Sequence, residues 1–346
     1  MKKKMENMFR NKKFLVTGGT GCIGSEIVRR LLEYKPKVVR IFSNDEDNTF
    51  RMMQEFGEAE NRRFLIGDIR DKERVIRATE GIDIVYHAAA LKHVPLCEYN
   101  PFEAIKTNVM GTQNVIEASL INNVEKMINI STDKAVNPAN TMGATKLLTE
   151  KLTIDANFYK GPRRTIFSCV RFGNVLFSRG SVVPLFEEQI RQKKPITITD
   201  PDMTRFMMSI SDTIDLVFKA TLMVKGGEIF VLKMPVIRIG DLTDVIIEKY
   251  AKKYGYKKED IKKKVTGSRP GEKMFEELMT ETEAKNAFET DDMLIITPQL
   301  ELSNIRYDVS DYQNARRSRL NQYISRNVKP LSKEKIKKLL IEQSFI

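Results

Sequence analysis

A glycine-rich segment near the start of the chain limits its possible fold more than any other feature. Residues 14–24 read FLVTGGTGCIG, an apolar run followed by glycines at positions 18, 21 and 24. The run Phe14–Val16 is typical of a buried strand, and Ser25–Tyr34 carries one apolar helical face. A strand, a glycine turn and a helix in this order indicate the first unit of a dinucleotide-binding sheet.

Each glycine has its own role in such a turn. Gly18 permits the tight turn, Gly21 lets the backbone approach a pyrophosphate, and Gly24 lets the helix pack closely on the strand. The helix N-terminus then faces the phosphates. The alternative to dinucleotide binding is that this glycine-rich turn is purely structural. The residues predicted to contact a dinucleotide here are Gly18, Gly21, Cys22, Ile23 and Gly24.

Strand and helix patterns alternate through the first half of the chain, which favours βαβ units. The segments predicted to be strands are Phe14–Val16, Val38–Phe42, Arg63–Ile66, Asp83–His87, Lys126–Ile130 and Thr165–Arg171. The predicted fold class is α/β, a doubly wound parallel (Rossmann) sheet with a second, smaller α/β domain. We expect the dinucleotide domain at 10–180 plus about 208–235, the smaller domain at 181–207 plus 236–300, and a C-terminal extension at 301–346.

Composition excludes several classes of protein. With 3 Cys and 2 His in the whole chain, we expect no metal site. No segment reaches the ~18 apolar residues of a membrane span, so we expect a cytoplasmic protein. The basic N-terminus, MKKKMENMFRNKK, has no apolar signal core after it and is expected to be frayed and solvated.

The chain is basic, with 58 Lys+Arg against 46 Asp+Glu and a net charge of +12. A partner could be nucleic acid, an anionic membrane or a small phosphorylated ligand. No interleaving of basic and aromatic residues supports nucleic acid. We interpret most of the excess as solvated surface.

The end of the second predicted strand bears on the choice of dinucleotide. An acid there would bind a ribose 2′-hydroxyl and repel a 2′-phosphate. The chain has neutral Ser43 and Asn44 at this point, and Asp45 is slightly late. The sequence therefore leaves both NAD and NADP open.

Several motifs resemble those of the extended short-chain dehydrogenase/reductase superfamily: TGxxGxxG, Gly67-Asp68-Ile69, His87-Ala88-Ala89-Ala90, Ser131 and Lys146. More narrowly, the segments 90–95 (ALKHVP), 131–138 (STDKAVNP), 171–175 (RFGNV), 179–184 (RGSVVP) and 269–273 (RPGEK) are similar to those of nucleotide-sugar 4,6-dehydratases. The nearest are those acting on UDP-N-acetylglucosamine, which begin bacterial pathways to pseudaminic and legionaminic acids. The resemblance runs from about residue 10 to 300.

This resemblance implies a tightly bound NADP or NAD, a UDP-sugar substrate and a homo-oligomer. Besides the turn residues above, it assigns to the cofactor Ser43, Asn44, Asp68, Ile69, Ala88, Ala89, Lys92, Asn108, Ser131 and Lys146. It assigns to the nucleotide sugar Lys92, His93, Asn174, Val183, Arg205, Arg269 and Glu272. His87, at the end of an apolar strand, is expected to be structural instead.

One residue departs from the superfamily pattern. The active-site Tyr, four residues before Lys146, is replaced by Met142, whose thioether cannot exchange a catalytic proton. Relatives that retain the configuration at C5 resemble this chain in carrying Met here. We therefore expect an active enzyme that draws its proton chemistry from other residues.

The reaction implied by the resemblance has three stages: oxidation at C4, elimination of water across C5–C6, and return of the hydride to C6. Elimination needs a base at C5 and an acid at the C6 hydroxyl. We expect Asp133 to be the acid and Lys134 the base, its pKa lowered by burial and a neighbouring cation. We expect Thr132 or a water to take the proton of the 4-hydroxyl and relay it towards Lys146.

Three other functions stay open. A nucleotide-sugar C4 or C5 epimerase would use the 4-keto stage but would not need the pair Asp133 and Lys134. A dehydratase could also act on GDP-N-acetylglucosamine. A non-catalytic dinucleotide sensor would have no need of the motifs at 179–184 and 269–273.

Overall fold

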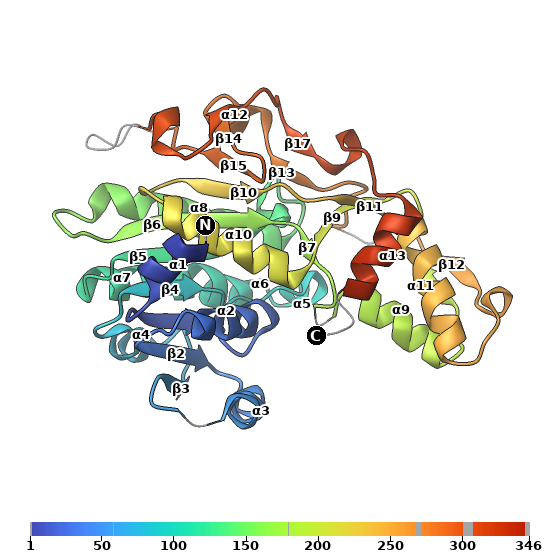
Figure 1. The fold of residues 1–346 in the computed structure, drawn as a ribbon, viewed down its shortest axis with the longest axis horizontal. Helices are drawn as coiled ribbons and strands as arrows, with labels where there is room; N and C mark the ends of the chain where they lie inside the picture. The colour runs from blue at the N-terminus through green and yellow to red at the C-terminus, as the bar shows by residue number, and fades with distance from the viewer. Residues whose placement is uncertain (1, 58, 179, 268–270, 300–306, 343–346) are drawn as a thin grey trace.

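The computed structural model describes residues 2–57, 59–178, 180–267, 271–299 and 307–342, and a large twisted sheet forms its centre (Figure 1). The sheet has ten strands in the order β16-β14-β15-β10-β6-β5-β4-β1-β2-β3. Seven are parallel: β3 (Arg62–Ile66), β2 (Val38–Ser43), β1 (Lys13–Thr17), β4 (Ile84–His87), β5 (Lys126–Thr132), β6 (Ile166–Phe172) and β10 (Ile229–Leu232). The other three are antiparallel: β15 (Met293–Ile296), β14 (Ala287–Glu289) and β16 (Arg316–Arg317).

Helices cover both faces of this sheet, and each face has its own hydrophobic core. On one face pack α2 (Cys22–Glu33) and α10 (Ile210–Met223); on the other pack α4 (Lys72–Thr79), α7 (Gly111–Ile121) and α8 (Thr141–Tyr159). A π-helical stretch, Ile105–Met110, joins the short α6 (Pro101–Ala104) to α7, and α5 (Val94–Tyr99) precedes α6. Beside the edge strand β3 lies α3 (Glu46–Phe56).

This arrangement confirms the predicted α/β doubly wound fold. All six predicted strands are present, with ends within two residues of those expected. The order of the parallel strands reverses between β1 and β4, where ligands bind in such sheets.

The expectation for the N-terminus was wrong. Residues Lys2–Phe9 form helix α1, with Met5 and Phe9 buried in the core beside α10. The ring of Phe9 packs edge-on against Phe14 and Phe218. The apolar positions four residues apart bind this helix to the fold, while Lys3 and Lys4 are exposed.

A smaller unit extends from one end of the sheet (right side of Figure 1) and has a separate core. It contains α9 (Val182–Arg191), α11 (Ile239–Lys253) and the last helix α13 (Lys333–Glu342). Its strands are β7 (Asn174–Val175), β8 (Ile196–Ile198), β9 (Thr204–Met208), β11 (Val236–Arg238) and β12 (Lys263–Val265).

The expected division of the chain differs from this arrangement at its C-terminal side. Strands β14 and β15, expected in the smaller domain, extend the large sheet, because β15 pairs antiparallel with β10. The expected C-terminal extension is divided in the same way: β16 joins the sheet, and α13 packs on α11. Two further strands, β13 (Glu277–Met279) and β17 (Tyr323–Ile324), pair with each other, and the short helix α12 (Glu281–Ala284) follows β13.

Candidate active site

The glycine turn between β1 and α2 lines a cavity of about 310 Å³ at the carboxyl edge of the sheet. Gly18 has a φ of 64°, and a Cβ there would lie 2.8 Å from Cα of Ala89. A Cβ at Gly24 would lie 2.2 Å from the carbonyl oxygen of Gly18. Both positions therefore require glycine, and the turn presents backbone and a helix N-terminus to the cavity.

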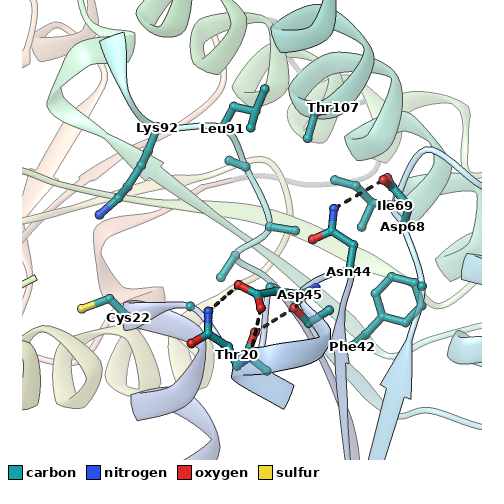
Figure 2. Close-up of a pocket in the computed structure, with 18 of the residues that line it drawn as sticks. Thr20, Cys22, Phe42, Asn44, Asp45, Asp68, Ile69, Leu91, Lys92 and Thr107 are labelled. Carbon is teal, nitrogen blue, oxygen red and sulfur yellow. Dashed lines mark hydrogen bonds between the residues drawn. The ribbon is translucent and has the colours of Figure 1, made fainter. Parts of the chain in front are cut away.

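Most of the predicted cofactor residues line this nucleotide cavity (Figure 2). They are Gly18, Gly21, Cys22, Ser43, Asn44, Asp68, Ile69, Ala88, Ala89 and Lys92. Ile23 and Gly24 line an adjoining central cavity of about 510 Å³. The prediction missed Thr20, Asn48 and Thr107, which also line the nucleotide cavity. Asp45 lies in its wall and caps α3 by accepting a hydrogen bond from the backbone of Asn48 at 2.9 Å.

Three predicted cofactor residues lie behind the lining rather than in it. Asn108 is buried and makes two hydrogen bonds to the backbone of Leu91, in the segment that follows β4. Ser131 donates its hydroxyl to Glu150 at 2.6 Å, and Lys146 donates to the carbonyl of Ile130 at 2.7 Å. In this structure the three side chains support the cavity wall.

The expected catalytic segment begins where β5 ends. Thr132 is the last residue of the strand, and Asp133–Ala135 form one 3-10 turn, η2. Oδ1 of Asp133 accepts hydrogen bonds from the Thr132 hydroxyl at 2.7 Å and from Nζ of Lys134 at 3.0 Å. Asp133 is fully buried, and its Oδ2 has no hydrogen-bond partner among the described residues. The three side chains form one connected polar group.

The pKa of Lys134 is shifted in the direction opposite to the one expected. Burial acts to lower its pKa, but the carboxyl groups of Asp133 and Glu276 outweigh burial, so the pKa lies above the ordinary lysine value. Arg205, the neighbouring cation, acts in the expected direction with a smaller effect. The predicted lowering was wrong because the sequence does not reveal that Glu276 comes so close to Lys134.

Met142 takes the place of the missing Tyr in the central cavity, together with Thr132 and Lys134. Its side chain is buried against Cys97 and Ala104. One turn further along α8, burial lowers the pKa of Lys146 to about 8. Thr132 donates to Asp133 and Lys146 donates to a backbone carbonyl, so no direct hydrogen bond joins Thr132 to Lys146.

A third cavity of about 230 Å³, the substrate cavity, is also lined by Lys134. It contains the predicted Asn174, Arg205 and Glu272, together with Lys273 and Glu276, which the prediction missed. Oδ1 of Asn174 is buried and has no hydrogen-bond partner among the described residues. Asn174 and Lys134 line both this cavity and the central one, so the two spaces meet at these side chains.

The other predicted substrate residues are distributed differently. His93 lines the nucleotide and central cavities, as does Lys92. Val183 is fully buried in the core of the smaller unit, where its contacts are apolar. Arg269 lies outside the described residues, as does Arg179 of the 179–184 motif.

His87 is structural, as expected. Its ring nitrogens are hydrogen-bonded to the hydroxyls of Thr17 at 2.7 Å and Thr112 at 2.9 Å. Burial lowers its pKa to about 3, so the ring is neutral at physiological pH. Its hydrogen bonds join β4 to β1 and α7 below the nucleotide cavity.

Across the described part of the chain, no helix is both long and apolar enough to cross a membrane. Within the same residues, no three His, Cys, Asp or Glu side chains are grouped as a metal site would require.

Comparisons with known proteins place this geometry in context. The profile of a family described as "Polysaccharide biosynthesis protein" matches residues 14–298. A protein of Methanocaldococcus jannaschii named "uncharacterized membrane protein" is 55% identical over 99% of both chains. A UDP-N-acetylglucosamine 4,6-dehydratase (inverting) of Campylobacter jejuni is 43% identical over 88% of both chains.

Two further similarities cover nearly the whole chain. A UDP-glucose 4-epimerase of Rickettsia prowazekii is 39% identical over 98% of both chains. The solved structure of Pen from Bacillus thuringiensis is 47% identical, with a TM-score of 0.90 over 98% of this chain and 99% of that one.

Proposed function

The chain belongs to the polysaccharide biosynthesis protein family, and from that premise we propose that it is a 4,6-dehydratase of UDP-N-acetylglucosamine. The observation that carries this proposal is the hydrogen-bonded group Thr132–Asp133–Lys134. Thr132 and Lys134 line the central cavity, and Lys134 also lines the substrate cavity. The relative named for this activity, at 43% identity, supports the choice of substrate.

The proposed cofactor is a nicotinamide dinucleotide, which the open glycine turn and the N-terminus of α2 would hold by its pyrophosphate. The chemistry that this group supplies when bound is reversible hydride transfer. We favour NAD, because the carboxylate of Asp45 lies in the wall where a 2′-phosphate would have to fit. The described lining of this cavity contains no arginine that could neutralise such a phosphate.

Oxidation at C4 requires a group that accepts the hydroxyl proton. Thr132 lines the central cavity and already donates its own proton to Oδ1 of Asp133. Thr132 can therefore take the proton of the sugar hydroxyl as its own proton moves to Asp133. In this proposal Asp133 replaces Lys146 as the end of the relay, and it leaves this step as a carboxylic acid.

Elimination then uses the same group. Neutral Lys134 removes the proton at C5, which the new ketone has made acidic, and Asp133 supplies its proton to the C6 hydroxyl, which leaves as water. Lys134 returns its proton to C5 when the hydride has reached C6. Because one group removes and returns the proton on one face, we propose that the configuration at C5 is retained, unlike that made by the relative named as inverting.

The second candidate is a nucleotide-sugar 4-epimerase, which the 39% identity to a protein of that name favours. Such an enzyme shares the oxidation at C4. It would leave the C6 hydroxyl in place, and Lys134 beside Asp133 would have no role.

The test is incubation with UDP- or GDP-N-acetylglucosamine in D2O, with NAD or NADP supplied separately. We expect loss of one water from the UDP sugar, retained configuration at C5 by NMR, and faster turnover with NAD. An isomer of unchanged mass would support the epimerase. No change in either sugar would exclude both functions.

A further inference from the structure

Glu276 is a buried carboxyl group to which the proposed reaction assigns no role. It is 5% exposed and lies just before β13. Its backbone N–H donates to the hydroxyl of Ser325 at 2.9 Å, and its carbonyl accepts from the backbone N–H of Ser325 at 2.8 Å. Ser325 opens the 3-10 turn η5 (Ser325–Asn327), so a segment near the C-terminus fixes the position of Glu276.

The carboxylate of Glu276 lies between Lys134 and Arg205, two of the three cations that line the described substrate cavity. Its Oε1 is 3.8 Å from Nζ of Lys134 and 3.5 Å from Nε of Arg205. Arg205 comes from β9 and Lys134 from η2, so Glu276 bridges the smaller unit and the end of β5. The cation Lys273 and the carboxylate Glu272 lie in the same cavity wall.

Charges from every side act on Glu276. Burial raises its pKa above the ordinary glutamate value and Asp133 adds to this, while Lys134, Arg205 and Lys273 act in the opposite direction. Glu276 therefore titrates closer to neutral pH than an exposed glutamate does. Such a group changes its protonation when a further charge arrives nearby.

A nucleotide diphosphate is the kind of ligand that brings such a charge. Besides Lys134, Arg205 and Lys273 are positive groups in the wall of the substrate cavity, and a diphosphate bound to these two would repel the Glu276 carboxylate. Protonation of Glu276 relieves this repulsion. It also removes one of the two carboxylates that hold the pKa of Lys134 up. Because Glu276 is only 3.8 Å from Nζ of Lys134, Lys134 loses its proton more easily when the diphosphate lies on the Arg205 side, farther from Lys134 than Glu276 is.

We propose that Glu276 is a positioning residue that couples the charge on Lys134 to the presence of a diphosphate beside Arg205. Lys134 stays charged in the empty site and becomes a usable base at C5 when the nucleotide sugar is bound. This inference rests on the proposed function for the identity of the ligand and of the base.

Binding of UDP alone tests the coupling without turnover. By linkage, a ligand that raises the pKa of Glu276 binds more tightly as the pH falls through that pKa. Glu276→Gln is neutral at every pH, so at pH 8 we expect it to bind UDP about tenfold more tightly than the parent, the equivalent of one pKa unit. The UDP affinity of this variant should also depend less on pH than that of the parent. The pH dependence that remains should be the part caused by titration of UDP itself.

Matched variants separate charge from structure. Glu277→Gln changes the next residue, whose carboxylate accepts from Nδ2 of Asn137 at 2.7 Å, and should bind UDP like the parent. Glu276→Asp keeps the carboxyl group and should keep the pH-dependent affinity. Calorimetry across pH 6 to pH 9 measures all four proteins.

Turnover gives the second readout. Loss of a negative neighbour lowers the pKa of Lys134, so the acid limb of kcat/KM should move to lower pH in Glu276→Gln. The acid limb of kcat should move less, because Glu276 is already protonated in the substrate complex of the parent.

The outcomes distinguish this inference from the proposed function. UDP affinity that is equal in the parent and Glu276→Gln, with equal pH dependence, overturns the coupling. An equal gain in Glu277→Gln also overturns it. A parent that binds UDP with the expected pH dependence but dehydrates no UDP sugar overturns the proposed function alone. A parent that does not bind UDP overturns both.

Discussion

At the scale of single residues, Thr132 is the point where a proton can pass between a bound sugar and the buried carboxyl group. Its hydroxyl lines the central cavity and donates to Oδ1 of Asp133 at 2.7 Å. Met142, in the position of the missing Tyr, lines the same cavity without any exchangeable proton. A single hydroxyl therefore carries the first proton transfer of the proposed reaction.

Thr132→Val removes this hydroxyl and keeps the shape of the side chain. We expect oxidation at C4 to fall by roughly a hundredfold or more, the usual contribution of a positioned proton-transfer group. The measurement is the absorbance of reduced nicotinamide after mixing with substrate, together with product formation. Thr132→Ser restores a hydroxyl and should recover most of the rate. Unchanged turnover in Thr132→Val would rule out this path for the proton.

At the scale of elements, α8 is fixed to the sheet by a buried ion pair close to the proposed catalytic segment. Arg171 of β6 forms a bidentate pair with Glu150 of α8, at 2.9 and 2.6 Å. Glu150 also accepts from Ser131, the neighbour of Thr132. Arg171 is bound in addition to Glu283 at 2.9 Å and to the carbonyl of Leu278 at 2.8 Å. This network sets the distance between β5 and the helix that carries Met142.

Glu150→Gln leaves Arg171 buried with one carboxylate fewer. We expect a loss of about 3–5 kcal/mol in the free energy of unfolding, the usual cost of breaking a buried pair. Urea denaturation measures it. Lys151→Gln, at the exposed neighbouring position, is the control and should change stability by less than about 0.5 kcal/mol. A small effect of Glu150→Gln would mean that Glu283 alone satisfies Arg171.

At the scale of the whole molecule, the chain crosses repeatedly between its two parts. After β12 of the smaller unit, β14, β15 and β16 extend the large sheet, β13 and β17 pair with each other, and α13 then packs on α11. Ile336 and Leu340 of α13 are buried in the core of the smaller unit. The C-terminal segment therefore contributes to both places: Ser325 binds Glu276 in the wall of the substrate cavity, and α13 packs into the core of the smaller unit.

Ile336→Ala should test this dependence. Truncating a fully buried isoleucine costs about 2–5 kcal/mol, so we expect a lower Tm and weaker UDP binding with less change in NAD binding. Ile341→Ala, on the same helix, removes a side chain that is 45% exposed and serves as the control. Thermal unfolding and calorimetry measure both. Equal effects of the two substitutions would contradict a role for α13 in the core.

Local features of the sequence were enough to predict the parts of the site that a single segment forms. The strand–turn–helix prediction was correct because Gly18 supplies the positive φ of the turn and Gly24 lies against the carbonyl of Gly18 within the same segment. The six strands were correct because apolar runs between amphipathic helices leave few other ways to bury both faces of a sheet. By contrast, the family resemblance assigned Asn108 to the cofactor, whereas in the structure its amide is hydrogen-bonded to the backbone of Leu91.

The sequence by itself determined the fold class, the nucleotide cavity and the segment Thr132–Lys134 at the carboxyl end of β5. Only the tertiary structure decided what surrounds that segment. Glu276 is 142 positions from Lys134 along the chain, and it reaches Lys134 because Ser325 holds its backbone in place. The charge of a buried lysine depends on all neighbours within a few ångströms, and those neighbours come from segments whose contact no local pattern records. For this reason the predicted lowering of the pKa of Lys134 was wrong, and its role as the base at C5 remains a proposal.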